Sequence, residues 1–163
     1  MARLRLTSQE LKRKKAELKR FERYLPMLIL KKLQLQNEVD RVREALNEKQ
    51  NEERALRSEM AEWIPVLGED VGFEDLVVSE DLVTRLVNTA GVQVPVFEKL
   101  VFSDVSYDFY AMPLWVDRAV EALEKLSVIG AEARILKEQL FLLERELRIT
   151  VQRVNLFEKI MIP

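Results

Sequence analysis

A seven-residue repeat of apolar side chains occupies residues 11–63 and constrains the fold more than any other feature of the sequence. Two positions of every heptad form the repeat, and twelve of the sixteen are apolar in a stretch without glycine. A heptad repeat of this length is typical of a long left-handed coiled coil. The two sets of positions are Leu11, Leu18, Leu25, Lys32, Val39, Leu46, Glu53 and Met60, and Lys14, Phe21, Leu28, Leu35, Val42, Lys49, Leu56 and Trp63.

The sequence marks both ends of this first helix. Thr7 and Glu10 form a capping box, in which each side chain can bind the other residue's backbone amide. Pro26 predicts a local kink, but the repeat keeps its register across it, so we expect one bent helix. The periodicity ends where Ile64 meets Pro65. We therefore assign residues 7–64 to an N-terminal coiled-coil helix, a rod of roughly 80 Å.

The middle segment, residues 65–112, has a different composition. It holds three of the four glycines and two of the five prolines. Apolar residues alternate with other residues from Val92 to Val96, with Leu100 and Phe102 following, and again from Val105 to Phe109, which predicts short strands and a β-hairpin. A segment this short buries little core by itself, so we expect it to lean on the neighbouring helix ends.

The last segment, residues 113–163, carries a second heptad repeat in which twelve of thirteen positions are apolar. Pro113 suits the first turn of a helix, and Gly130 is the weak point of the pattern. The repeat positions are Ala119, Leu126, Ala133, Leu140, Leu147, Val154 and Met161, and Ala122, Ile129, Leu136, Leu143, Thr150 and Phe157.

Two long heptad helices joined by a small insertion are expected to fold back on each other. The predicted fold is mainly α: a long antiparallel two-helix coiled coil with a small β-hairpin-containing insertion at its base. If Trp63 lies opposite Trp115, Met161 lies opposite Glu17, and the first turns of the chain have little partner. Leu18 and Leu140 are among the residues predicted in the seam.

The charges are unevenly distributed along this predicted rod. Residues 1–32 contain eleven Lys or Arg against three Asp or Glu, and residues 58–84 contain eight acids without a base. One interpretation is a set of solvated helix faces and an acidic loop. The other is a rod with a basic tip and an acidic base that face different partners.

The composition argues against an enzyme active site. The chain has neither cysteine nor histidine, which removes the usual nucleophile, general base and zinc ligands. No glycine-rich phosphate loop is present, and the acidic pairs at 69–70 and 74–75 lack the spacing of an EF-hand. We expect no catalytic residue, cofactor or metal. The N-terminus lacks a signal peptide and no apolar run spans a membrane, so we expect a soluble, cytoplasmic chain without membrane insertion.

Two other functions fit parts of the pattern. Basic turns followed by a heptad repeat suggest a zipper-type DNA-binding protein. However, the small residues and Asn that read bases are missing, and the second helix supplies a partner within the same chain. We expect no nucleic-acid partner. A generic antiparallel coiled-coil adaptor or scaffold remains the alternative.

Two stretches resemble the D subunit of V-type and A-type ATPases. QRVNLFEKIMIP is similar to the RRVNALEYVLIP signature of that family, and NTAGVQVPVFEKL is similar to its NIxGVxVPxF stretch. YLPMLILKK departs from the archaeal and eukaryotic pattern and is closer to a bacterial branch. The matching residues are Arg153, Val154, Asn155, Glu158, Ile162, Pro163, Asn88, Gly91, Val92, Val94, Pro95 and Phe97.

The resemblance implies a non-catalytic central-stalk rotor shaft. In that family the shaft transmits torque between the catalytic ring of A and B subunits and the ion-translocating membrane ring. It also binds the F subunit and the C subunit, the latter called d in eukaryotes, and belongs to a complex peripheral to the membrane. The family's last helix continues beyond the Ile-Pro pair, so the resemblance implies that this chain is C-terminally truncated.

The resemblance also implies where partners bind. The basic first turns would lie within the catalytic ring, and the hairpin would lie near the F and C subunits. The candidate partner-binding residues are Lys12, Arg13, Lys15, Lys19, Arg153, Asn155, Glu158, Val94 and Phe97.

Overall fold

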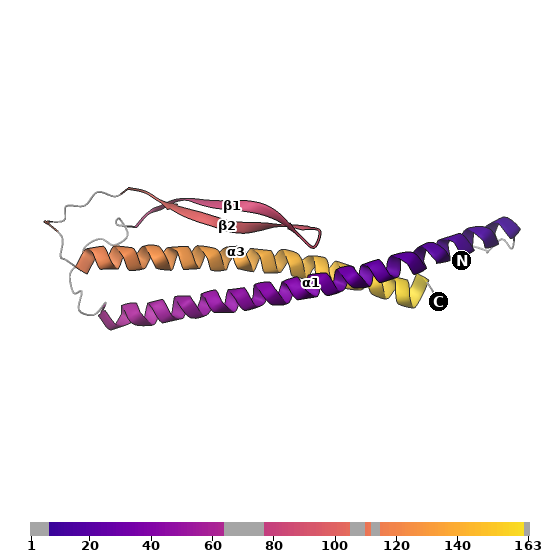
Figure 1. The fold of residues 1–163 in the computed structure, drawn as a ribbon, viewed down its shortest axis with the longest axis horizontal. Coiled ribbons are helices and arrows are strands. Elements are labelled where there is room, and N and C mark those ends of the chain that lie inside the picture. Colours follow the sequence, from indigo (N-terminus) through magenta and orange to yellow (C-terminus); the bar gives the residue numbers. More distant parts are fainter. Residues whose placement is uncertain (1–6, 64–76, 105–109, 112–114, 162–163) are drawn as a thin grey trace.

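The chain forms a long rod of two antiparallel helices with a hairpin along one side (Figure 1). The computed structural model describes residues 7–63, 77–104, 110–111 and 115–161. The elements are helix α1 (Ser8–Trp63), strands β1 (Ser79–Thr89) and β2 (Val92–Phe102), helix α3 (Trp115–Leu156) and the π-helical turn η2 (Phe157–Met161). The predicted fold class is confirmed.

Helix α1 is one uninterrupted helix of 56 residues that contains Pro26. Its start agrees with the predicted cap, because the Glu10 amide donates to Thr7 Oγ1 at 3.3 Å. The expectation of a single helix across the proline is therefore confirmed. Packing of the heptad face on both sides of Pro26 favours one helix over two.

The core of the rod is the seam between α1 and α3. Leu35 and Val39 of α1 and Leu143 of α3 are fully buried there. The predicted register places Phe157 opposite Phe21, and the two rings meet edge to face with centroids 5.2 Å apart. This contact agrees with the register inferred from the heptads.

Burial along the seam differs from the prediction at two positions. Leu18 is 36% exposed, although the repeat placed it inside, and Leu140 is half-buried rather than fully buried. Leu18 lies in the upper part of the rod, where α1 has little cover. Near Leu140 on α3, the leucine that is fully buried is Leu143.

Ion pairs cross the seam and link the two helices at three levels. Both partners are partly buried in the Lys31 and Lys49 pairs, whereas the Arg43 pair is exposed to solvent. The pairs join Lys31 Nζ to Glu146 at 2.9 Å, Arg43 to Glu144 at 2.7 Å, and Lys49 Nζ to Glu132 at 2.7 Å. Pairs of this kind resist sliding of one helix along the other.

The hairpin pairs β1 with β2 around a two-residue turn at Ala90 and Gly91. Both turn residues have positive φ, 51° and 83°, as a tight primed turn requires. The Gly91 amide donates to Asn88 Oδ1 at 2.9 Å and fixes the turn.

The position of the hairpin in the sequence corrects the prediction in part. Strand β2 coincides with the alternating run from Val92, but its partner is β1, which precedes it, rather than a strand built on residues 105–109. Those residues lie outside the described part of the chain. Strand β1 has irregular register near Asp81 and Thr84, which breaks the alternation that would have identified it.

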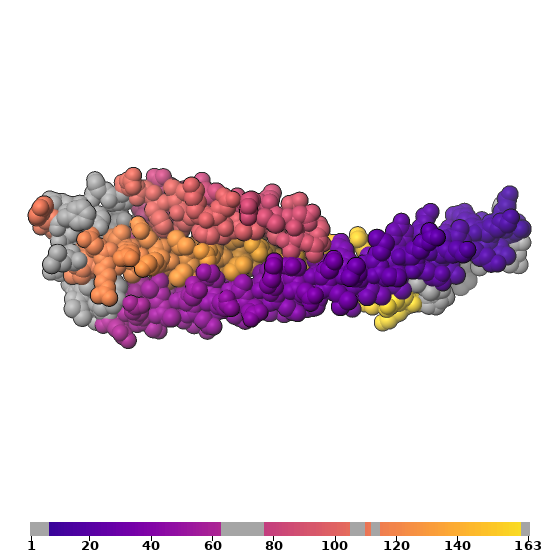
Figure 2. All heavy atoms as spheres, viewed as in Figure 1, coloured from indigo at the N-terminus to yellow at the C-terminus, as the bar shows by residue number. Residues whose placement is uncertain are grey.

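The hairpin lies along α3 rather than at the helix ends alone (Figures 1 and 2). Val94 is 2% exposed and belongs to the same core cluster as Leu35 and Leu143. Gln139 Nε2 donates to the Pro95 carbonyl at 2.6 Å. The hairpin tip is thereby fixed to the middle of the rod.

Candidate functional site

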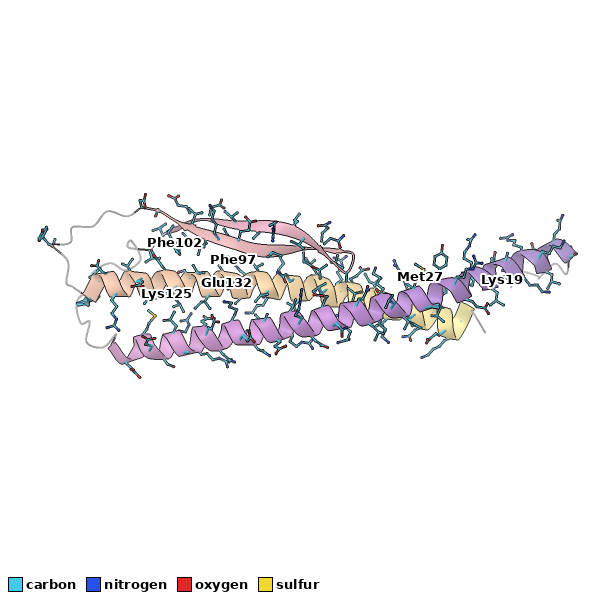
Figure 3. All side chains as sticks on the ribbon, in the orientation of Figure 1. Lys19, Met27, Phe97, Phe102, Lys125 and Glu132 are labelled. Atoms are coloured by element: carbon cyan, nitrogen blue, oxygen red, sulfur yellow. The ribbon has the colours of Figure 1, made fainter. Side chains whose placement is uncertain are left out.

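Nine of the thirteen exposed large hydrophobic side chains of the described residues lie on the upper shaft, which we define as residues 8–33 of α1 together with residues 154–161. In this region α1 extends beyond the hairpin, and Figure 3 shows Lys19 and Met27 there. In the middle of the rod, α1, α3 and β2 share one apolar core, whereas among the described elements the upper shaft has only the end of α3 and η2 against it.

The basic candidates Lys12, Arg13, Lys15 and Lys19 are all exposed. Of these, Arg13 is held in part by Glu17, with Nε 3.3 Å from the carboxylate.

Glu17 moderates this basic segment. Its carboxylate also accepts a hydrogen bond from Lys14 at 3.1 Å. This bond, followed by the charge of Lys14 and the contact with Arg13, keeps the pKa of Glu17 below its usual value. Lys12, Lys15 and Lys19 have no ion pair among the described residues and provide the free positive charge of this face.

Large apolar side chains lie exposed next to the basic turns. Met27 is 65% exposed, and Leu30 and Leu33 are exposed to nearly the same extent. An open groove of about 460 Å³ follows this surface, and Pro26 and Ile29 lie in its wall. A monomer rarely leaves such side chains together in water, so this apolar band is a candidate contact surface.

The heptad repeat does not predict this apolar band, although the sequence contains a signal for it. The run from Leu25 to Leu30 fills seam and non-seam positions of the heptad alike. A helix that is apolar all round is buried by something. Since α3 covers only one face of α1, the remaining apolar face is exposed and is a candidate contact surface.

The C-terminal candidates lie close to the upper shaft. Arg153, Asn155 and Glu158 are exposed, and Glu158 belongs to the π-helical turn η2. Ile160 in the same turn is 70% exposed. These residues therefore share one end of the rod with the basic and apolar side chains of α1.

The hairpin candidates lie elsewhere and differ from each other. Phe97 is half-buried. Val94 is buried in the core, so its side chain cannot contact a partner directly, and we correct its assignment to a residue that holds the hairpin on the helices. The structure thus brings the basic and C-terminal candidates together and separates them from the hairpin.

Within the described residues, no group of three or more metal-binding side chains comes together. None of the described helices is long and apolar enough to cross a membrane.

Comparison with known proteins gives a consistent result. Residues 10–163 match the family model described as the D subunit of ATP synthase. The V-type ATP synthase D subunit of Borreliella burgdorferi is 42% identical over 163 residues, which cover all of this chain and 81% of that protein. The proteins of the same name from Chlamydia pneumoniae and Chlamydia trachomatis serovar L2 are 35% and 32% identical, each over 98% of this chain and 78% and 80% of theirs.

Proposed function

Because the chain belongs to the family of ATP synthase D subunits, we propose that it is the rotating shaft of a V-type ATP synthase. The D subunit of this complex is a central-stalk subunit. The shaft would transmit torque between the catalytic A/B ring and the ion-translocating ring in the membrane. Membership of the family does not favour an adaptor or a DNA-binding protein.

The observation that carries the proposal is the construction of the rod. Two helices share an apolar seam, and cross-helix ion pairs such as Lys49 with Glu132 resist sliding. A shaft that transmits torque needs this lateral packing because a loosely packed pair would absorb the twist. Its work is conformational coupling between sites rather than chemistry.

The upper shaft would contact the catalytic ring. Its free lysines, including Lys12 and Lys19, and its exposed Met27 and Leu30 give this end a mixed basic and apolar surface. A shaft turning inside a ring needs contacts that form and break repeatedly. Separate apolar side chains and solvated charges suit that requirement better than deep interlocking pockets.

The remaining partners are assigned by the family relation. The F subunit would bind along the rod, and the C subunit, called d in eukaryotes, would hold its base. The candidate contacts are the exposed Arg153, Asn155 and Glu158, with Phe97 on the hairpin. The chain itself would be non-catalytic, and it would work in the cytoplasm at the surface of the membrane.

Rotation of the shaft can be tested directly. The chain has no cysteine, so Glu80→Cys on the exposed part of β1 gives this protein a single attachment point for a bead. In a complex assembled with the A, B and F subunits, we expect ATP to drive stepwise rotation of the bead. A complex that hydrolyses ATP while the bead stays still would overturn the proposal.

A double variant tests the proposed contact between the upper shaft and the A/B ring. Met27→Asp with Leu30→Asp places charge on the apolar band, and we expect it to prevent co-elution with the A/B ring while the F subunit stays bound. Leu86→Asp is the matched control, because Leu86 is similarly exposed but lies on the hairpin. Equal loss of the ring in both variants would contradict the assignment of the upper shaft.

A further inference from the structure

The lower rod carries a second surface, a groove formed between α1 and α3 near the base. The groove has a volume of about 730 Å³ and is open to solvent along its length. Its apolar lining, which we call the floor, consists of Ala55, Leu56, Val128, Ile129 and Phe102 at the end of β2. Figure 3 shows Phe102 at the hairpin end above α3 and Lys125 on α3 facing α1.

The helices present regular ridges to this groove. Glu52, Leu56 and Glu59 lie one turn apart on α1, and Glu121, Lys125 and further residues at the same spacing lie on α3. Two such ridges form the cradle into which a third helix packs in a bundle. A smaller hollow shares Leu56, Glu59 and Glu121 and continues the groove toward Met60. The groove is therefore several helical turns long.

The rim of the groove is acidic. Four glutamates line it against one lysine, Lys125, and the smaller hollow adds one arginine, Arg118. Glu52 pairs with Lys49 and Glu121 pairs with Lys125. Two glutamates have no ion pair within the described part of the chain, and they lie on opposite sides of the groove. They are Glu59 on α1 and Glu124 on α3.

We propose that this groove binds an amphipathic helix of a partner protein, with an apolar stripe on the floor and Lys or Arg on both flanks. Burial of the floor supplies the attraction, and the flanking bases pair with Glu59 and Glu124. The small side chain of Ala55 lets the partner backbone approach closely. A small molecule fits poorly because the groove is open along its length.

A second copy of this chain is the nearest competing occupant, since its own first turns are basic and carry exposed Leu11 and Leu18. That contact would join the tip of one rod to the base of the next. Such a head-to-tail contact does not close on itself and would produce open chains of molecules. We therefore assign the groove to a different protein.

Two synthetic peptides test the proposal on the full chain. Both are cross-linked helices of about 18 residues, roughly five turns, with the same Leu and Ala stripe. One has Lys and Arg on its flanks and the other has Glu. By fluorescence anisotropy, we expect the basic peptide to bind at least about tenfold more tightly than the acidic one. Equal affinity would overturn the proposal.

Reversing the charges of the two unpaired glutamates tests whether the basic peptide binds in this groove. Glu59→Lys with Glu124→Lys should lower the affinity of the basic peptide for the chain roughly tenfold. Glu48→Lys with Glu138→Lys is the matched control, since both residues are exposed on the same helices outside the groove and the net charge changes equally. If the control loses the same affinity, the attraction is general and the groove is not the site.

Two further measurements complete the test. Ala55→Gln fills the floor without a change of charge, and we expect weaker binding of the basic peptide with unchanged circular dichroism. Concentration-dependent self-association that Glu59→Lys and Glu124→Lys abolish would assign the groove to a second copy and overturn the proposal. Neither result depends on the rotor function, which is tested separately by the rotation of a bead attached through Glu80→Cys.

Discussion

At the scale of single residues, Gly91 is the position where the backbone alone sets the choice of residue. Its φ is +83°, and a Cβ added there would meet no atom within 4 Å. Gly91→Ala should therefore destabilise the chain by about 1–2 kcal/mol through backbone strain, without any clash. Urea unfolding measures the loss. An unchanged midpoint would mean that the turn adopts another conformation.

The ion pairs of Lys49 should make the stability of the fold depend on pH. The hydrogen bond of Lys49 to Glu132 is the main cause that raises its pKa above the ordinary lysine value of about 10.4, and its hydrogen bond to Glu52 raises the pKa further. A raised pKa in the folded state means that the pair stabilises the fold below about pH 10.4 and that this contribution is lost as the pH rises through the folded-state pKa.

The measurement compares Lys49→Met with the unchanged chain by urea unfolding at pH 8 and above pH 11. Since both partners are partly exposed, we expect a difference of about 1 kcal/mol at pH 8, shrinking at the higher pH. Glu132→Gln should show the same trend. A difference that is independent of pH would assign the effect to the packing of the lysine stem.

At the scale of elements, α3 is the helix on which the other two layers depend, because α1 packs on one side and the hairpin on the other. Leu143 is fully buried, whereas Leu140 is half-buried. Leu143→Ala should cost about 2–5 kcal/mol, and Leu140→Ala clearly less. Thermal or urea unfolding compares the stabilities of the two variants. A larger loss of stability in Leu140→Ala would show that the seam is centred on Leu140 instead.

At the scale of the whole molecule, stability should fall from the middle of the rod toward its tip. The core around Leu35, Val39 and Leu143 joins three elements, while Leu11 is 58% exposed. Local opening costs little where few apolar contacts are lost. Amide hydrogen exchange should therefore be at least about a hundredfold faster in residues 8–18 than in residues 35–46. Similar rates in an isolated monomer would mean that the upper shaft is packed in solution.

The sequence alone was sufficient for the two helices and their pairing. A heptad repeat fixes which face of a long helix is apolar, and two such faces in one chain have each other as the nearest partner. The contact of Phe21 with Phe157 follows from that register. The division into segments 7–64, 65–112 and 113–163 stays a prediction, as do the partner contacts of the exposed candidates.

Only the tertiary structure decided which apolar residues are covered. Val94 and Met27 are both apolar residues in patterned segments, yet Val94 is buried against two helices and Met27 stays in water. The position of the hairpin makes this difference, and it depends on contacts between residues far apart in the chain, such as Gln139 with Pro95. Periodicity records which side of an element is apolar. It carries no information about which distant element will lie against that side, because that choice is made by the packing of the whole molecule.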